Sequence, residues 1–415
     1  MNKPIERFPF IIMHMKKHNM FKYRQYFFWV FFFSLINVYG QKAIPVAGHV
    51  YDENGYEIPF AAVGIIQKNI GTSTTEDGEF YFVISEKELS DTLQISSLGF
   101  ETYRVNLRDY LNKKTKTIEL VEQTTNLSEV VVTTSDVYVK MAFKKLKENT
   151  VSKSHQLKTL YRRWSVEDNL CRFFIEHYIN VIDRGPNGFI TSFNVEQART
   201  SADYRFIKNE QKMHALMYMA YNNPLRKGMS ASVYAWKKVS NSSYDGEDVV
   251  VTEGTRKNGE VLRLYIGMDT HKIYKFDITK YPEVGKFLKA TYVYKKNADG
   301  KLYLSYHQRE WEGATRLSEE IKRALRSANK PTPEYIPIAY RHEMYVLGIE
   351  EDKKLFDSYQ GEQPKDMTRY KVPFNANFWK GIGIPPNTRF YNKNIAELES
   401  LFGVPVEQQF KYSGL

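Results

Sequence analysis

Alternating hydrophobic and polar positions between residues 41 and 133 predict a series of short β-strands. Residues 46–51 alternate and stop before Asn54-Gly55, a dipeptide that favours a hairpin turn because both residues tolerate positive φ. The other strands are expected at 58–67, 79–84, 91–97, 101–107 and 115–121, with turns such as 74–78 between them. About seven strands in roughly 90 residues, without a helical period, predict a small β-sandwich.

The pattern changes to a helical period over residues 136–150, where Asp136 is suited to cap the start of a helix. The apolar face of this helix consists of Val139, Ala142, Phe143, Leu146 and Thr150, and the residues around that face are Lys140, Lys144, Lys145 and Lys147. We expect the helix to pack on a second domain that follows it.

The rest of the chain is again rich in strand patterns, at 160–166, 173–182, 189–197, 249–255, 260–267, 272–278, 290–296, 302–309 and 343–347. Hairpin turns are expected at 257–260 and 298–301, and helices at 210–221, 317–327 and 394–402. The predicted fold class is mainly β: a seven-stranded β-sandwich, then a larger curved antiparallel sheet (α+β) with a few helices. The predicted domains are a signal peptide (1–40), the sandwich (41–123), a linker and helix (124–150) and a β-rich domain (151–415).

Residues 1–40 have the layout of a secretory signal. The basic stretch 16–24 precedes the apolar run 27–36, which is too short to span a bilayer, since a membrane helix needs about 20 residues. We predict cleavage between Gly40 and Gln41, with an uncleaved anchor as the alternative. No cysteine lies near Gly40 to accept a lipid, so a lipoprotein is not expected, and no later stretch is apolar enough to predict a spanning helix.

The net charge of +11 comes largely from the front of the chain. Six basic residues and one acidic residue in 1–40 supply +5, which leaves +6 for the remainder. The later basic residues are scattered among acids, whereas a nucleic-acid surface needs clustered lysine and arginine. We therefore expect no nucleic-acid partner.

Candidate catalytic and metal-binding groups are few. Cys171 is the only cysteine, so the chain has no internal disulfide, cysteine zinc cage or iron-sulfur site, and a buried apolar role is expected for it. His307 and Glu310 have the His-x-x-Glu spelling of a zinc carboxypeptidase. Residues three apart on a strand point to opposite faces, and His342 is the only later histidine, so zinc is not expected.

No nucleophile elbow, Walker loop, dinucleotide fingerprint or His-Glu-x-x-His motif is present in the sequence. His177 is expected to be an ordinary strand residue. We accordingly assign no catalytic residue, no cofactor-binding residue, no metal ligand and no cofactor, and leave the binding residues open.

The first strands and turns resemble a known family, the carboxypeptidase regulatory-like domain, over the segments 48–55, 58–63, 71–80 and 95–102. The resemblance covers residues 45–121 and implies a transthyretin-like (prealbumin-like) sandwich without catalytic activity. It also implies a place directly after the signal peptide in envelope proteins of Bacteroidetes. Asp77 and Gly78 are expected to be turn residues and not calcium ligands.

Residues 126–133 resemble the junction that precedes the plug of TonB-dependent receptors. The chain that follows is too short for a plug and a barrel of about 22 strands. The receptor itself is therefore excluded.

A second resemblance concerns the strand and turn sequences 244–254 and 264–273, which are similar to periplasmic half-barrel proteins of the lipoprotein-carrier type. Tyrosines such as Tyr292, Tyr294, Tyr303 and Tyr306 place rings on this sheet. An open concave face would hold an acyl chain or a peptide, whereas helices 210–221 and 394–402 across it would make the rings core, which we favour. A glycan platform would use Trp236, Trp311 or Trp379.

These patterns together predict an exported, non-enzymatic envelope protein, located in the periplasm or at the outer membrane, whose sandwich is a docking or spacer module and whose larger domain binds an unidentified ligand. Its partner is an envelope protein, a lipid or a glycan, and the prediction allows peripheral membrane association. The alternatives are a periplasmic carrier of a hydrophobic ligand in an open half-barrel, and a hydrolase with unrecognised carboxylates.

Overall fold

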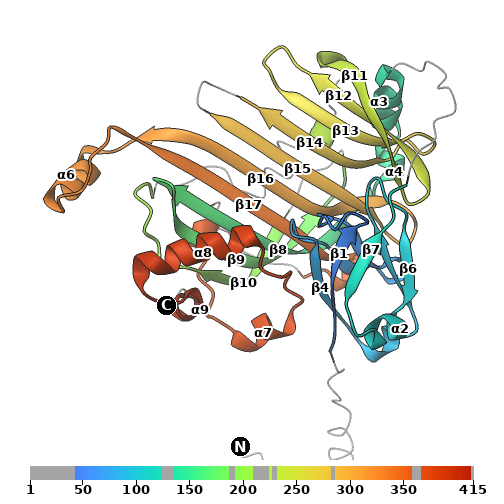
Figure 1. Cartoon of the computed structure of the whole chain (residues 1–415), viewed down its shortest axis with the longest axis horizontal. Coiled ribbons are helices and arrows are strands. Elements are labelled where there is room, and N and C mark those ends of the chain that lie inside the picture. The colour runs from blue at the N-terminus through green and yellow to red at the C-terminus, as the bar shows by residue number, and fades with distance from the viewer. Residues whose placement is uncertain are drawn as a thin grey trace, which may run out of the picture. The chain divides into compact units, whose positions relative to one another are not determined.

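The computed structural model describes residues 43–123, 135–186, 192–208, 224–226, 231–281, 286–357 and 366–412 (Figure 1). Three sequence predictions lie outside these residues: the signal peptide 1–40, the receptor-like junction 126–133 and the helix 210–221. Among the described residues, no helix is both long and apolar enough to cross a membrane.

The sandwich contains seven strands, in agreement with the predicted number of about seven, although residues 70–73 were not among the predicted ranges. β1 (Ile44–Asp52) pairs with β4 (Glu79–Ile84) antiparallel and with β7 (Thr117–Leu120) parallel. The second layer has the spatial order β3 (Ile70–Ser73), β2 (Ala62–Ile65), β5 (Thr92–Ser96) and β6 (Tyr103–Asn106). Apolar side chains from both layers, among them Val50, Phe80 and Ile95, form its core.

Three local features of the sandwich differ from the prediction. The expected strand 58–67 contains only β2, because the 3-10 helix η1 (Ile66–Lys68) turns the chain into β3. The Asn54-Gly55 turn forms, with Gly55 at φ 81°, but the hairpin that it closes is limited to the single antiparallel bridge between Tyr51 and Glu57, and β1 otherwise pairs with β4 and β7. Helix α2 (Leu107–Asn112) was not predicted. Its Tyr110 hydroxyl donates to the Ala47 carbonyl at 2.7 Å.

The larger domain is a curled half-barrel of antiparallel strands, which confirms the predicted fold class (Figure 1). Its neighbours run in the order β11 (Ala235–Tyr244), β12 (Glu247–Thr255), β13 (Val261–Gly267), β14 (Ile273–Lys280), β15 (Phe287–Lys296), β16 (Leu302–Arg316), β17 (Tyr335–Glu350), β8 (His155–Glu167), β9 (Leu170–Asp183) and β10 (Ser192–Thr200). The turns predicted at 257–260 and 298–301 form, with Gly259 and Gly300 at positive φ. β11 and the outer half of the β16–β17 hairpin were not predicted.

β17 belongs to both domains. It pairs with β16 and β8 along its length, and its Gly348 also pairs with Ile70 of β3 in the sandwich. The sheet therefore continues from the half-barrel into the sandwich.

The helices are short and lie on different faces of the sheet. The predicted helix 136–150 is divided into α3 (Ser135–Lys144) and α4 (Leu146–Asn149), and Asp136 lies in the first turn of α3. The other helices are α6 (Glu319–Ser327), α7 (Ala376–Gly381), α8 (Arg389–Phe402) and α9 (Val406–Tyr412), of which α7 and α9 were not predicted. The 3-10 turns are η2 (Glu86–Glu88), η3 (Pro224–Arg226), η4 (Ala231–Val233), η5 (Lys353–Leu355) and η6 (Met367–Arg369).

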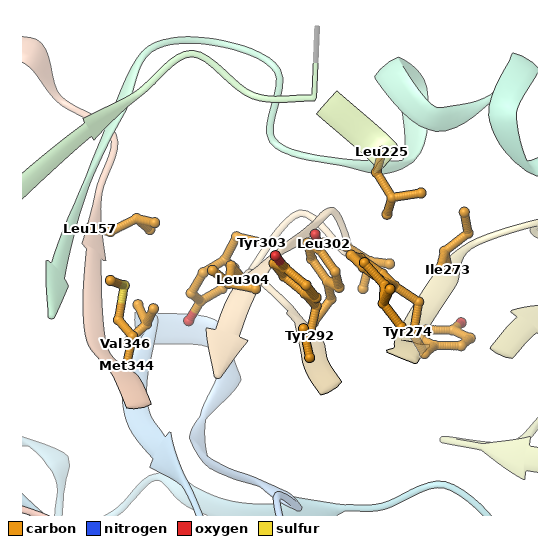
Figure 2. Close-up of a cluster of buried hydrophobic side chains, with 14 of the residues drawn as sticks. Leu157, Leu225, Ile273, Tyr274, Tyr292, Leu302, Tyr303, Leu304, Met344 and Val346 are labelled. Atoms are coloured by element: carbon orange, nitrogen blue, oxygen red, sulfur yellow. The ribbon is translucent and has the colours of Figure 1, made fainter. Parts of the chain in front are cut away.

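The half-barrel strands bury separate sets of side chains on both faces of the sheet. One set fills the inside of the curl, where Tyr292, Tyr303 and Leu304 pack with Met344 and Val346 (Figure 2). Val139 and Ala142 of α3 join this inner cluster. The other face is packed against α8 and α9, around Trp164 and Phe174.

The four sheet tyrosines considered in the sequence analysis are therefore core, as favoured there. Tyr292, Tyr294, Tyr303 and Tyr306 are all buried. The predicted cover was wrong in one respect: residues 394–402 of α8 pack on the face opposite the inner cluster.

Candidate functional site

A groove of about 340 Å³ lies between the sandwich and the half-barrel. The sandwich contributes the segment from Asp52 to Ala62 and the loop from Ser96 to Phe100, and the half-barrel contributes residues of β11, β13, β14 and β15. This volume is within the range of about 300–1,000 Å³ that small-molecule sites have, and such sites favour domain interfaces. The lining residues are Asp52, Glu57, Ile58, Pro59, Phe60, Ala62, Ser96, Ser97, Leu98, Phe100, Ser242, Tyr244, Tyr265, Tyr274, Lys275 and Val293.

Aromatic rings from both domains form much of the groove. Phe60 of the sandwich stacks on Tyr306 of β16, with ring centroids 4.2 Å apart. On the half-barrel side Tyr244 stacks on Tyr274 at 4.3 Å. Phe60 has φ 59°, in the left-handed region that a bulky residue rarely adopts. Backbone strain of this kind is concentrated at ligand clamps and other functional positions.

The charged groups of the groove differ in how fully they are paired. Asp52 Oδ1 accepts the backbone N–H groups of Asn54 and Tyr56 at 2.9 and 2.8 Å. Glu57 is paired with Arg389. Lys275 lies over the Tyr265 ring at 5.1 Å, and its ion pair with Asp277 is long, at 3.5 Å. Lys275 is the one lysine or arginine among these lining residues, and its internal ion pair is long.

Asp245 of the half-barrel, next to the lining residue Tyr244, bonds to two residues of the sandwich. Its carboxylate accepts from the Thr102 hydroxyl at 3.0 Å and from Arg104 Nη2 and Lys296 Nζ at 2.8 Å. Burial alone would raise the pKa of Asp245, but the bonds from Lys296, Thr102 and Arg104 lower it below the ordinary value. The Gly99 N–H also donates to the Ser243 carbonyl at 2.8 Å, so the 96–100 loop is held against the end of β11.

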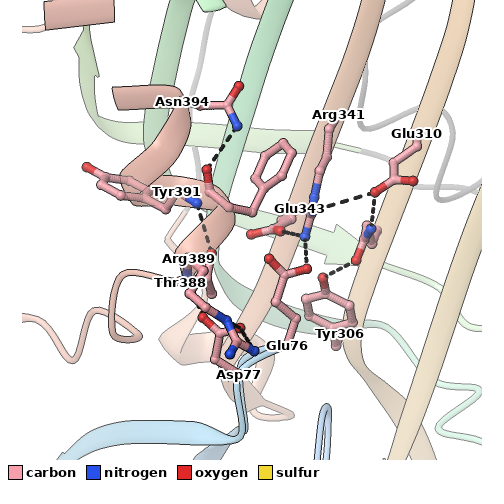
Figure 3. Close-up of polar contacts among 12 residues, drawn as sticks. Glu76, Asp77, Tyr306, Glu310, Arg341, Glu343, Thr388, Arg389, Tyr391 and Asn394 are labelled. Atoms are coloured by element: carbon pink, nitrogen blue, oxygen red, sulfur yellow. Dashed lines mark hydrogen bonds and ion pairs between the residues drawn. The ribbon is translucent and has the colours of Figure 1, made fainter. Parts of the chain in front are cut away.

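A second set of ion pairs holds the other side of the junction (Figure 3). Glu76, in the β3–β4 turn of the sandwich, pairs with Arg341 of β17 at 2.6 Å, and Arg341 also pairs with Glu310 and with buried Glu343. Burial raises the pKa of Glu343 despite this partner.

Asp77, beside Glu76, is a turn residue as predicted, and Gly78 has φ 76°. The Asp77 carboxylate has a further role that the sequence did not reveal. It accepts the Arg389 backbone N–H at 2.6 Å and Arg389 Nε at 3.1 Å (Figure 3). A turn of the sandwich therefore holds the first residue of α8.

The His-x-x-Glu pair of the sequence is separated, as expected from the strand geometry. His307 Nδ1 contacts the Thr291 carbonyl at 3.0 Å, and its Nε2 lies 3.2 Å from His342 Nε2. Glu310 instead accepts from Gln308 Nε2 at 2.7 Å and pairs with Arg341. Within the described ranges, no three His, Cys, Asp or Glu side chains lie close enough together to hold a metal ion.

Cys171 and His177, the other two residues considered from the sequence, contribute to the packing of the sheet. Cys171 is buried, and burial raises the pKa of its thiol to about 12, which disfavours a nucleophilic role. His177 Nε2 contacts the Met367 carbonyl at 2.8 Å.

The three tryptophans of the suggested glycan platform lie in different settings. Trp236 donates from Nε1 to the Ala231 carbonyl at 2.7 Å, and Trp379 is buried beneath Arg199. Trp311 is half-buried and stacks on Tyr340, with ring centroids 5.8 Å apart. They do not form one platform.

The groove itself was missed from the sequence, because its residues come from distant segments. Phe60 carries no local signal of its positive φ. Asp245 does carry a local signal, because Asp245-Gly246 is a strong hairpin-turn dipeptide between β11 and β12. Both residues of this dipeptide have positive φ. That signal places the turn but gives no hint of the partners across the junction.

Comparison with known proteins supports the sandwich assignment. Residues 46–132 match the model of the CarboxypepD_reg-like domain. None of the curated proteins matches the chain.

Solved structures similar to the chain align with slightly more than half of it. A LolA superfamily protein from Nitrosomonas europaea is 13% identical, with a TM-score of 0.21, and the match covers 55% of this chain and 99% of that one. A domain described as an outer membrane lipoprotein-sorting protein from Vibrio parahaemolyticus is 10% identical, with a TM-score of 0.26, covering 52% and 94%. A DUF1329 family protein from Desulfovibrio piger is 13% identical, with a TM-score of 0.21, also covering 52% and 94%.

Proposed function

We propose that the protein is an exported, non-catalytic binding protein of the cell envelope, and that the groove between its two domains holds the ligand. The observation that carries this proposal is the groove itself: about 340 Å³, lined by aromatic rings from both domains. Export is supported by the signal-like residues 1–40 and by the match to the CarboxypepD_reg-like domain that follows them.

The lining favours a ligand with an apolar or aromatic body and an anionic group. Leu98, Phe100 and Tyr265 are half-buried and present apolar surface to the groove. Lys275 supplies the cation, since its pairing with Asp277 is long. The two lining carboxylates, Asp52 and Glu57, are engaged by backbone amides and by Arg389 and so are not poised as general bases.

As far as the described residues show, the inside of the half-barrel is a less suitable place for the ligand. Its rings pack on one another, and the cavity beside Tyr294, Tyr303 and Leu304 measures about 30 Å³. That space suits one or two water molecules and is far too small for an acyl chain. The carrier alternative is therefore best supported in a modified form, with the hydrophobic ligand held between the domains.

Binding of two dyes tests this proposal: anionic 8-anilinonaphthalene sulfonate and uncharged N-phenyl-1-naphthylamine. We expect both to bind saturably at one site, and the Ser97→Trp variant, which fills the groove, to lose both. Lys275→Gln should weaken the anionic dye several-fold and leave the uncharged dye unchanged.

Val239→Trp is the matched control, because it adds the same ring at an exposed position of β11. Equal dye binding by Ser97→Trp and Val239→Trp would place the dye elsewhere and overturn the proposal. Native mass spectrometry of protein taken from envelopes then identifies the natural ligand by its mass.

A further inference from the structure

The segment from α3 to β8 carries the densest group of lysines in the described part of the chain. Between residues 140 and 153 there is one acidic residue, Glu148, and there are five lysines: Lys140, Lys144, Lys145, Lys147 and Lys153. Lys140 pairs with Asp136 at 2.9 Å. Lys144, Lys145 and Lys147 have no ion-pair partner among the described residues.

The outward face of α3 combines these lysines with apolar side chains. Val139 and Ala142 are buried against the inner cluster. At 100° per residue, Val137, Lys140 and Lys144 fall on the opposite side of the helix, with Met141 next to them. Val137 is 44% exposed, both lysines are exposed, and Met141 is half-buried.

A helix surface that combines lysines with one exposed and one half-buried apolar side chain matches the chemistry of an anionic membrane. The lysines attract acidic headgroups, and side chains such as Val137 and Met141 enter the boundary between headgroups and acyl chains. An acidic protein surface would satisfy the lysines but would gain little from these apolar side chains.

We propose that α3 and α4 form a docking surface for a bilayer rich in anionic phospholipid. The surface consists of Val137, Lys140, Met141, Lys144 and Lys147. It holds the protein peripherally on the membrane, and it does not depend on the groove or its ligand.

Vesicle co-sedimentation of the processed protein, with its first residue checked by sequencing, tests the surface. We expect binding to vesicles of phosphatidylglycerol and phosphatidylethanolamine, no binding to phosphatidylcholine vesicles, and loss of binding in 1 M NaCl, where charges are screened within about 3 Å. The double variant Lys144→Gln/Lys147→Gln should weaken the partition about 10- to 30-fold.

The matched control is Lys353→Gln/Lys354→Gln, which removes the same charge from two exposed lysines of η5. Both variants change surface residues, and circular dichroism checks that each is folded. The proposal is overturned if the wild-type protein fails to bind the anionic vesicles, and retention on a heparin column would not rescue it, because heparin reports charge alone. It is also overturned if the control variant lowers binding as much as the Lys144→Gln/Lys147→Gln variant.

Discussion

The His307 and His342 side chains share one hydrogen bond inside the half-barrel. The Thr291 carbonyl can only accept, so His307 carries its proton on Nδ1. His307 Nε2 is then the acceptor, and the N–H of His342 Nε2 donates to it across 3.2 Å. This arrangement requires the His307 ring to be neutral, because its Nε2 must keep a lone pair to accept. Burial lowers the pKa of His307 to about 3, and burial together with His307, Arg309 and Arg163 lowers that of His342.

Because this pair must stay neutral at His307, we expect the free energy of unfolding to decrease in mild acid. Below the ordinary histidine pKa of 6.5, His307 becomes protonated in the unfolded chain but stays neutral in the folded protein. The free energy of unfolding is therefore highest above pH 6.5 and falls as the pH drops toward 3. His307 alone should contribute a slope of about 1.4 kcal/mol per pH unit. Urea unfolding at pH 7, 6 and 5 measures it.

His307→Gln should reduce that slope, even if the variant is less stable at pH 7. His271→Asn is the control, because His271 lies at the surface in a turn with φ 60° that asparagine tolerates. An unchanged slope in His307→Gln would mean that the pair does not titrate as described.

At the scale of elements, the start of α8 is held by two caps from different parts of the chain. Thr388 accepts from the Tyr391 N–H at 3.0 Å in the usual N-cap manner. Asp77 places a carboxylate on the first N–H of the helix, where the positive end of the helix dipole favours it. The orientation of α8 is thus tied to a turn of the sandwich.

Removal of each cap should therefore lower the free energy of unfolding. We expect a loss of about 1 kcal/mol for Thr388→Ala and of about 1–2 kcal/mol for Asp77→Ala. Asp77→Asn should recover part of the second loss, because it keeps an acceptor in the turn. Ser318→Ala removes the cap of the short, largely exposed helix α6 and should cost less. Denaturant unfolding ranks the four variants, and a rank with Ser318→Ala at the top would contradict this account.

Elements with a strong local pattern were predictable, and those fixed by tertiary contacts were not. β4 was predicted to the residue because its alternation is regular and a turn with Gly78 precedes it. β11 was missed because its central residues, including Lys237, Lys238 and Ser240, are exposed at a sheet edge and show no apolar alternation. Of the candidate site, only turn residues such as Asp77 were visible, since Arg389 lies over 300 positions away in the chain.

At the scale of the whole molecule, several contacts join the sandwich to the half-barrel. Glu57 and Asp77 pair with Arg389, Glu76 pairs with Arg341, and Phe60 stacks on Tyr306. Contacts of this number and kind should couple the unfolding of the two domains.

We therefore expect a single calorimetric transition for the wild-type chain. The triple variant Glu57→Gln/Glu76→Gln/Asp77→Asn removes the sandwich carboxylates of the junction and should split the transition into two. The control, Glu253→Gln/Glu260→Gln/Glu334→Gln, breaks ion pairs inside the half-barrel. It should lower the transition temperature without splitting it. Two transitions in the wild-type chain would show that the domains unfold independently.

The first residue of the exported protein is a separate prediction for the whole chain. Cleavage after Gly40 gives a mature protein that begins with Gln41. Amino-terminal sequencing of protein from the envelope fraction checks this prediction. A sequence that begins upstream of residue 27 would support the uncleaved anchor.

The strand β17, which pairs with β3 as well as with β16 and β8, also bears on the order in which the molecule is assembled. Ile70 of β3 precedes Gly348 by most of the chain, so a newly exported sandwich has an open edge until β17, near the end of the polypeptide, has also crossed the membrane. A helper that shields this edge in the interval, such as a holding chaperone, would raise the yield of correctly assembled molecules, and chains truncated before β17 should be the most prone to aggregate.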